Sequence, residues 1–278
     1  MTNYVLDNAW QHERERLDSL TVPYDDASLA FCTAAGLRSG WRCLEVGPGT
    51  GQFALRLAEV VGAAGNVLAV DIDTRLAAPV AGPNLEVRRM DVRTEPLPQD
   101  VFDLVHARLV VEHLPDRAEV LAKLVAALKP GGWLVVEDFD NVTAFVCEPP
   151  SDVHAKVAHA MYAVMHASGF DELLGRRLLG LLNALGLCEI ETQGWLDVVC
   201  GDPEVGVPQW SLLVDQLAPP MLTSGAITEA DLDEFRTLLH DPSVTMYSPT
   251  LIRARGRRHE THEAELLRPT AAATATVR

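Results

Sequence analysis

LEVGPGTGQF, residues 44–53, is the stretch that decides the fold of this chain. It is typical of the end of a buried strand, a glycine-rich turn and the start of a helix. Glycines at 47, 49 and 51 tolerate positive φ and carry no Cβ, so a ligand can lie against the backbone. Glu45 places a carboxylate beside the turn. Because position 52 is Gln, the G-x-G-x-x-G dinucleotide fingerprint is not met, and the chain has no G-x-x-x-x-G-K-[ST] phosphate loop.

Short apolar runs alternate with helical patterns on both sides of this stretch, which predicts right-handed βαβ units and a parallel sheet covered on both faces. In the first half, strands are expected at 41–46, 66–71, 84–90, 101–106 and 133–138, and helices at 25–36, 51–61 and 116–129. In the second half, helices are expected at 151–168, at 171–185 and twice within 205–240, and strands at 187–200, with a break near Gly194, and at 245–256.

Composition limits the classes of function. The chain has 278 residues and a net charge of −16, which disfavours nucleic acid as a partner. Five scattered cysteines without a C-x-x-C pair, and a polar N-terminus without a signal-peptide core, predict a soluble, cytoplasmic protein. No run approaches the roughly 18 apolar residues of a membrane span. The sequence leaves open whether the protein is a monomer or a homodimer.

Carboxylates follow the ends of two further strands. Asp71 ends the strand at 66–71, where a carboxylate in a doubly wound fold accepts hydrogen bonds from ribose hydroxyl groups. Asp73 is a nearby competitor for this role. Asp91 follows the strand at 84–90, where it can accept from an adenine amino group. The segment 102–108 brings the end of the fourth strand to the same edge of the sheet.

These pieces together resemble class I methyltransferases that depend on S-adenosyl-L-methionine (SAM), and more narrowly the ubiquinone/menaquinone-type and bacterial natural-product methyltransferases. The matching strings are LEVGPGTG, AVDID, RMDV, FDLVHARLVVEHLPD and LKPGGWLVVED. The resemblance implies a doubly wound, mostly parallel, seven-stranded Rossmann-like α/β sheet. It also implies an N-terminal helical lid (1–40), a methyltransferase domain (41–258) with a helical cap over the acceptor (151–240), and a flexible tail (259–278).

The resemblance also implies roles for individual residues around SAM, with S-adenosylhomocysteine as the product. The methionine end would contact the glycine loop and the strands beside it, through Glu45, Gly47, Gly49, Gly51 and the backbone of His106 or Ala107. The adenosine end would contact residues after the second and third strands, namely Asp71, Ile72, Asp91 and Val92. SAM has a cationic sulfur and no pyrophosphate, so carboxylates suit it better than a basic cradle.

Methyl transfer from a sulfonium mainly requires that the acceptor be held in line with the methyl group. A base is needed only where the acceptor must lose a proton. His113 and Asp138 are the candidate catalytic residues, with Glu112 and His106 as further candidates. The alternative for His113 is a loop histidine that orders its turn, and the alternative for Asp138 is a solvated turn carboxylate.

Two other segments have alternative interpretations. The arm at 4–20, with Tyr4 and Trp10, forms either a lid over the cofactor or a solvated surface helix. His159, Tyr162 and His166 share one helical stripe, which lines an acceptor pocket, forms part of a core or is an exposed polar face. Their spacings do not suit a metal site, and none is predicted.

The sequence therefore predicts a SAM-dependent methyltransferase that acts on a small molecule, in bacterial secondary metabolism such as natural product biosynthesis. A second possibility is a SAM-binding relative of the same fold that catalyses a non-methylating reaction, since fold does not determine chemistry. A third is a binding module without turnover. The acceptor, and the methylation of O, N or C, are left open.

Overall fold

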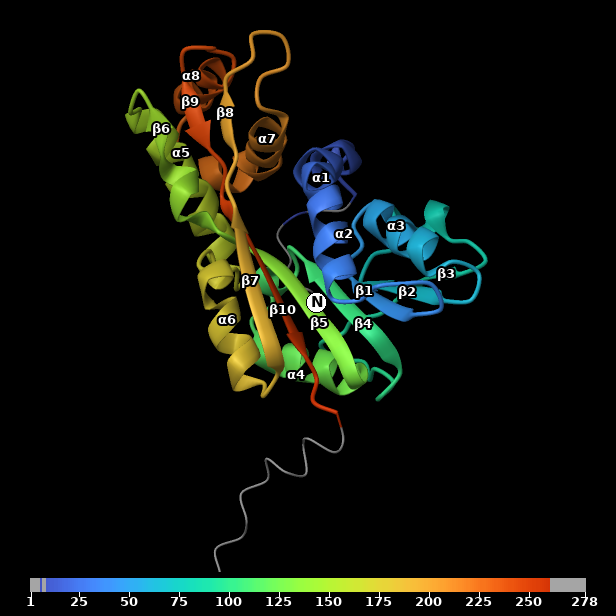
Figure 1. Ribbon diagram of the computed structural model, residues 1–278. Coiled ribbons are helices and arrows are strands. Elements are labelled where there is room, and N and C mark those ends of the chain that lie inside the picture. The colour runs from blue at the N-terminus through green and yellow to red at the C-terminus, as the bar shows by residue number, and fades with distance from the viewer. Residues whose placement is uncertain (1–5, 7–8, 261–278) are drawn as a thin grey trace, which may run out of the picture.

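The structure, a computed structural model, describes Leu6 and residues 9–260 (Figure 1). A seven-stranded sheet forms its centre, in the order β3-β2-β1-β4-β5-β10-β7. Its strands are β1 (Arg42–Val46), β2 (Asn66–Asp71), β3 (Leu85–Arg89), β4 (Phe102–Arg108), β5 (Leu128–Asp140), β7 (Cys188–Trp195) and β10 (Thr250–Arg257). The first five strands pair in parallel, and β10 runs antiparallel to both β5 and β7. The predicted mostly parallel, seven-stranded α/β sheet is confirmed.

Helices cover both faces of this sheet, because neighbouring residues of a strand point to opposite faces. On one face, α2 (Asp25–Ala34) and α3 (Gln52–Val61) pack over Cys43 and its neighbours. On the other face, α4 (Arg117–Ala127) and α6 (Leu174–Ala184) pack over Leu44 and its neighbours. Both faces of the central strands β1, β2, β4 and β5 are therefore buried, which explains their apolar runs, whereas the edge strands β3 and β7 are largely exposed.

A second group of elements lies beyond the sheet, at the top of Figure 1, and we call it the helical cap. It contains α5 (Asp152–His166), α7 (Pro208–Thr223), α8 (Glu229–Leu239) and a small sheet of β6 (Cys147–Glu148), β9 (Thr245–Tyr247) and β8 (Val198–Cys200). The cap has its own apolar core, which includes Met161, Trp210 and Phe235. Helix α6 does not belong to the cap, since it packs on β5, β7 and β10. The segment 151–240 is therefore shared between the cap and the sheet.

The two C-terminal strands are interrupted at other positions than the sequence suggested. The expected strand at 245–256 is divided at Ser248 and Pro249 into β9 and β10, because proline has no N–H to donate to a sheet. The expected break near Gly194 lies instead at 196–197, where the backbone N–H of Asp197 donates to the Ser248 hydroxyl at 2.9 Å. Gly194 itself stays in β7 and pairs with Ile252 of β10.

The N-terminal arm is helical over a shorter range than expected. Helix α1 covers Glu13–Thr21 and runs through a 3-10 turn, η1 (Val22–Tyr24), directly into α2. Pro23 lies in this turn, near its start, where its missing N–H costs nothing. Tyr4 and residues 261–278 of the expected tail lie outside the described residues.

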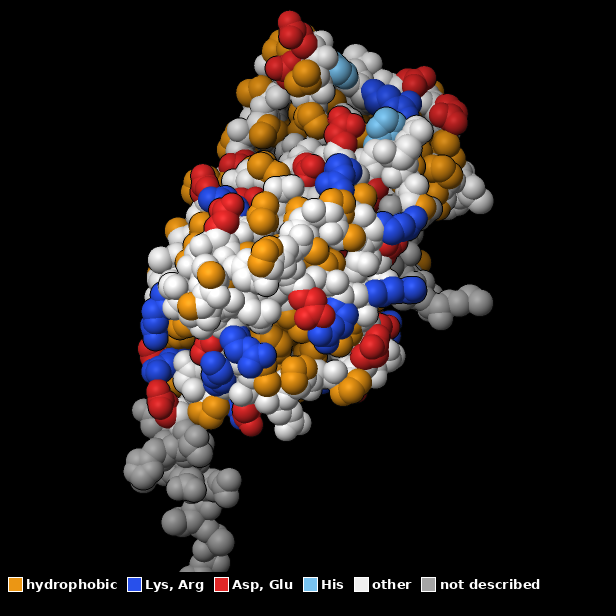
Figure 2. Space-filling view, turned by 90° about the vertical axis from the view of Figure 1, so that its right-hand side faces the viewer, with side chains coloured by type: hydrophobic (Ala, Val, Ile, Leu, Met, Phe, Trp, Pro, Cys, Tyr) orange, Lys and Arg blue, Asp and Glu red, His pale blue; other side chains and the backbone are white. Residues whose placement is uncertain are grey.

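The surface carries charges of both signs. Figure 2 shows acidic and basic side chains interspersed over the face that is turned toward the viewer. Ion pairs join separate segments of the chain, as where Nε of Arg93 lies 2.9 Å from Oδ1 of Asp116. Within the described part of the chain, no helix has both the length and the hydropathy needed to cross a membrane.

Candidate active site

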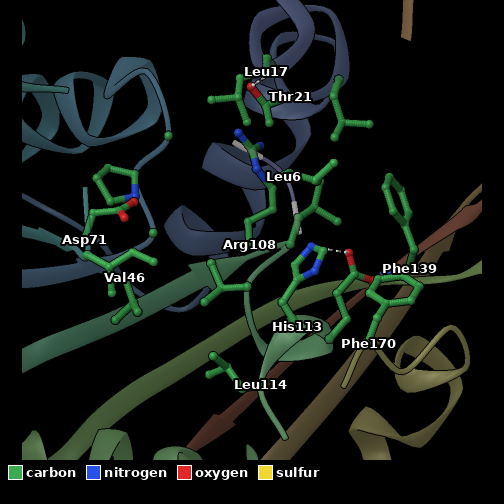
Figure 3. Close-up of a pocket in the computed structure, with 18 of the residues that line it drawn as sticks. Leu6, Leu17, Thr21, Val46, Asp71, Arg108, His113, Leu114, Phe139 and Phe170 are labelled. Carbon is green, nitrogen blue, oxygen red and sulfur yellow. Dashed lines mark hydrogen bonds and ion pairs between the residues drawn. The ribbon is translucent and has the colours of Figure 1, made fainter. Parts of the chain in front are cut away.

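A cavity of about 240 Å³ lies at the carboxyl ends of the parallel strands, between the sheet, α1 and the cap (Figure 3). Val46 and Asp71 lie on one side of it, and His113, Phe139 and Phe170 on the other, as Figure 3 shows. Ligands bind at this edge of open α/β sheets, because the loops that follow parallel strands meet there.

Two of the three loop glycines line the cavity. Gly47 has a φ of +68°, and a Cβ there would lie 2.2 Å from Cγ2 of Val110. Gly49 has a φ of +56° and lies against Leu17 of α1. Gly51, expected to contact the cofactor, is not among the lining residues. It precedes α3 with a φ of +85°, and a Cβ there would lie 2.5 Å from Val80, so its role is in packing.

Three carboxylates and two apolar residues expected at the site line the same cavity: Glu45, Asp71, Ile72, Asp91 and Val92. One oxygen of Asp71 accepts a hydrogen bond from the Asp73 backbone at 3.0 Å. Burial raises the pKa of Asp71 to about 6. The carboxylate of Asp73 is instead held by Arg75 at 2.9 Å, and this hydrogen bond lowers its pKa. Asp71 is therefore better placed than Asp73 to receive new hydrogen-bond donors.

The end of β4 differs from the expectation. His106 and Ala107 do not line the cavity, and the chain first reaches it at Arg108, Leu109 and Val110. Leu109 has a φ of +56°, which is uncommon outside glycine, and its N–H donates to the Glu137 carbonyl at 2.8 Å. No local sequence signal marks a leucine for this conformation. The side chain of His106 is buried beneath the cavity and contacts Glu45.

The two candidate bases have different positions. His113 lines the cavity, and its ring centroid lies 5.1 Å from that of Phe170. Burial, together with the charge of Arg16, lowers the pKa of His113 to about 3, so the imidazole is neutral. Asp138 is fully buried and does not line the cavity, and one of its oxygens accepts from the Glu112 backbone at 3.3 Å. Asp138 is therefore neither a solvated turn carboxylate nor placed to touch an acceptor.

The cap contributes an aromatic and apolar wall. Tyr162 lines the cavity, and its hydroxyl group donates to Oδ1 of Asn141 at 2.7 Å. His159 and His166, on the same predicted stripe, are exposed, and Nε2 of His166 lies 3.1 Å from Oε2 of Glu172. The stripe is thus divided between the cavity and the solvent. Met165 of α5 also lines this wall. The remaining residues of the wall have no local sequence signal, because only packing brings them here: Phe139 of β5, Phe170, Gln209, Trp210 and Leu213.

Helix α1 forms the roof of the cavity. Arg16, Leu17 and Leu20 line it from above. The guanidinium of Arg16 is buried and donates twice to Glu13, at 2.6 and 2.8 Å. Glu13 also accepts from Gln216 of α7, at 3.2 Å. These contacts connect the roof with the cap. In Leu6 and residues 9–260, no group of three or more His, Cys, Asp or Glu side chains is arranged to hold a metal ion.

Comparison with known families agrees with this geometry. Residues 10–177, more than half of the chain, match the sequence profile of a family described as a methyltransferase domain. The chain belongs to this methyltransferase family. Two relatives are Methyltransferase str2 of Strobilurus tenacellus and the ubiquinone/menaquinone biosynthesis C-methyltransferase UbiE of Pseudomonas entomophila.

The sequence similarity covers about half of each protein. The chain is 34% identical to str2 over 51% of itself and 52% of str2. It is 33% identical to UbiE over 39% of itself and 46% of that relative. The chain thus spans about half the length of the curated relatives it matches.

Solved structures share the methyltransferase fold. YcgJ of Bacillus subtilis has a TM-score of 0.55 and 17% identity, covering 83% of this chain and 97% of that one. Phosphoethanolamine N-methyltransferase 2 of Haemonchus contortus, solved with SAM, has a TM-score of 0.54 and 17% identity, covering 85% and 53%. The [4+2]-cyclase SpnF has a TM-score of 0.52 and 21% identity, covering 85% and 81%.

Proposed function

We propose that this protein transfers a methyl group from SAM to a small-molecule acceptor. The observation that carries the proposal is the division of one cavity into two chemically different halves. Carboxylates and the glycine loop line the half beside β1, β2 and β3, whereas mainly aromatic and apolar side chains from the cap and β5, with Glu112 and His113, line the other half. Such a cavity suits a cationic, nucleoside-containing cofactor on one side and an apolar acceptor on the other.

The residues of the first half fit SAM. Asp71 is desolvated, which raises its pKa to about 6, and hydrogen bonds from ribose hydroxyl groups would compensate for the lost water. Asp91 and Val92 would hold the adenine, and Ile72 would pack on it. Glu45, Gly47 and Gly49 would hold the methionine portion, where the glycines leave room for a close approach.

When bound, SAM supplies an electrophilic methyl group on a sulfonium that leaves as a neutral thioether. The protein's task is then to orient the acceptor and to exclude water. The roof of Arg16 and Leu17 and the wall of Phe139 and Phe170 would do both. For an acceptor that must lose a proton, we propose His113 as the group that receives it, because its imidazole lines the cavity. Burial lowers the pKa of His113 to about 3, so this role requires that the bound acceptor stabilise the protonated imidazole.

The acceptor half indicates the class of substrate. Its wall is mainly apolar, with polar atoms at few positions, such as the Tyr162 hydroxyl and the Asn141 amide. UbiE is named for C-methylation in quinone biosynthesis. We infer a small, largely apolar acceptor, of the kind found in natural product biosynthesis.

The His113 assignment has its own test. His113→Phe keeps an aromatic ring next to Phe170 and removes the proton acceptor. We expect kcat to fall by about 100-fold or more while the KM for SAM stays unchanged. A variant with the kcat of the wild type would leave His113 only the role of ordering its turn.

Calorimetry and mass spectrometry test the proposed function in two steps. Isothermal titration of the full chain with SAM and with S-adenosylhomocysteine should detect binding of both, and no binding of either would refute the proposal. Incubation with SAM and a panel of phenolic and quinol acceptors should yield a product heavier by one methyl group. Turnover of an acceptor without this gain would instead support a non-methylating reaction, as the shared fold of the cyclase SpnF suggests.

A further inference from the structure

His106 lies between two carboxylates beneath the cavity. Its Nδ1 is 2.7 Å from Oε2 of Glu45 in β1, and its Nε2 is 3.1 Å from Oε1 of Glu137 in β5. His106 lies in β4, which pairs with β1 on one side and β5 on the other. In the backbone register, Glu45 lies directly opposite His106. All three side chains are buried, with exposed fractions of 2% for Glu45 and 0% for the other two. Both ring nitrogens of His106 therefore face a carboxylate oxygen away from solvent.

The proton count of this arrangement follows from the chemistry of imidazole. A neutral imidazole has one N–H and one lone pair, so it can donate to only one of two carboxylates. The other nitrogen would then direct its lone pair at an oxygen lone pair. An imidazolium has two N–H groups and satisfies both carboxylates. The geometry thus requires a doubly protonated His106 as long as both glutamates are ionised.

The surroundings keep Glu137 ionised. Its Oε2 accepts from the Ser28 hydroxyl at 2.8 Å and from Nε of Arg253 at 3.0 Å. Burial by itself would raise the pKa of Glu137, but the hydrogen bond and charge of His106, and the charge of Arg108, outweigh it and lower the pKa. For His106, burial lowers the pKa, but the charge of Glu45 and the hydrogen bonds to both glutamates raise it to about 9.

Charge balance gives the same answer. Besides His106, the charged groups of the buried cluster are Asp25, Glu45, Arg108, Glu137 and Arg253. These are three carboxylates and two guanidinium groups, so a charged His106 makes the cluster neutral, as burial requires. The Phe53 ring, 4.5 Å from the His106 ring, and the thiol of Cys32, whose pKa burial raises, complete the surroundings.

We propose that His106 is a positioning residue, whose imidazolium holds the Glu45 carboxylate toward the ammonium group of the SAM methionine portion. This proposal rests on the proposed function. The hydrogen bond to His106 uses Oε2 of Glu45, and the same residue lines the cavity beside Gly47 and Gly49. Without the imidazolium, the Glu45 side chain loses both its anchor and its counter-charge, and it no longer holds one orientation.

A pair of ligands distinguishes positioning from a general structural role. S-Adenosylhomocysteine carries the ammonium group, whereas 5′-methylthioadenosine has the same adenosine and thioether without the amino acid. In His106→Gln, we expect the Kd of S-adenosylhomocysteine to rise about tenfold, which is about 1.4 kcal/mol, and the Kd of methylthioadenosine to stay within about twofold. Asp71→Asn serves as the matched control, because it should raise the Kd of both ligands by the same factor.

The wild-type protein offers a second measurement that does not depend on the folding of a variant. Nitrogen-15 NMR of histidine-labelled protein at pH 8 should show one doubly protonated imidazole, since an unperturbed histidine, with a pKa of about 6.5, is neutral there. A spectrum without such a histidine overturns the proposal, as does equal weakening of both ligands, or of neither, in His106→Gln. Absence of S-adenosylhomocysteine binding to the wild type would refute the proposed function, and this inference with it.

Discussion

The hydroxyl group of Thr50, in the glycine loop, donates a hydrogen bond to Asp18 of α1, with 2.7 Å between Oγ1 and Oδ1. Arg14, one turn earlier in α1, donates to the Leu76 carbonyl at 2.8 Å. Because Glu13 accepts from Gln216 of the cap, α1 is attached on both sides of the cavity that it covers. We therefore expect these contacts to slow the release of a ligand from the half of the cavity beside the glycine loop.

Thr50→Val should speed the release of S-adenosylhomocysteine. The substitution keeps the side-chain shape and removes one hydrogen bond, worth about 1 kcal/mol, so a rise of roughly fivefold in the dissociation rate is expected. Surface plasmon resonance measures this rate. Thr33→Val is the control, since its hydroxyl bonds only within α2, to Leu29. Equal rates in all three proteins would contradict a closing role for α1.

Asp71→Asn should weaken SAM binding. Loss of charge-assisted hydrogen bonds to the ribose costs about 1–3 kcal/mol, a rise of roughly 5- to 150-fold in Kd by calorimetry. Burial raises the pKa of Asp71 to about 6, so the carboxylate is the main form above pH 6. Wild-type affinity should therefore fall as the pH drops below about 6, and the variant should lack this change. Asp73→Asn, whose carboxylate binds Arg75, should alter Kd less than about twofold.

Gly47→Ala should destabilise the protein and prevent cofactor binding. Its left-handed φ and the 2.2 Å approach to Val110 together should cost about 2–4 kcal/mol in the free energy of unfolding. Urea unfolding measures this value. Gly180→Ala, on the exposed face of α6 with nothing within 4 Å of the new Cβ, should stabilise by about 0.5–1 kcal/mol. A Gly47→Ala variant as stable as the wild type would refute the packing argument.

His154→Leu should make the protein less sensitive to acid. His154 is buried in the cap near Trp210 and Phe235, and neither ring nitrogen has a hydrogen-bond partner. Burial lowers its pKa below 6.5, so the folded state keeps it neutral while the unfolded state binds a proton as the pH falls. The neutral His154 therefore contributes fully to the free energy of unfolding above pH 6.5, and this contribution is lost as the pH falls below 6.5.

For each pH unit below 6.5, the protonation of His154 in the unfolded state should lower the free energy of unfolding by up to about 1.4 kcal/mol. Urea unfolding between pH 7 and pH 5 should therefore show a shallower decline for His154→Leu than for the wild type. His159→Leu, at an exposed position of the same helix, should keep the wild-type slope. Identical slopes in all three proteins would show that His154 is not neutral in the fold.

Much of the candidate site followed from local pattern. Asp71 and Asp91 are predictable because Asp71 ends one expected strand and Asp91 follows the next, and parallel topology brings such strand ends to one edge. The same pattern predicts a ligand contact for Gly51, but Gly51 does not line the cavity, and a Cβ there would lie 2.5 Å from Val80. The left-handed backbone of Leu109 has no local sequence signal, because its N–H donates to a carbonyl of β5.

The sequence by itself determined the α/β sheet, the glycine loop and the carboxylates beside it, because apolar periodicity and turn residues act within a few positions of the chain. Only the tertiary structure decided that α1 covers the cavity, that His113 lines it while Asp138 does not, and that His106 lies between Glu45 and Glu137. Those relationships join residues far apart in the chain. Side-chain packing between layers sets them, and no local pattern encodes it.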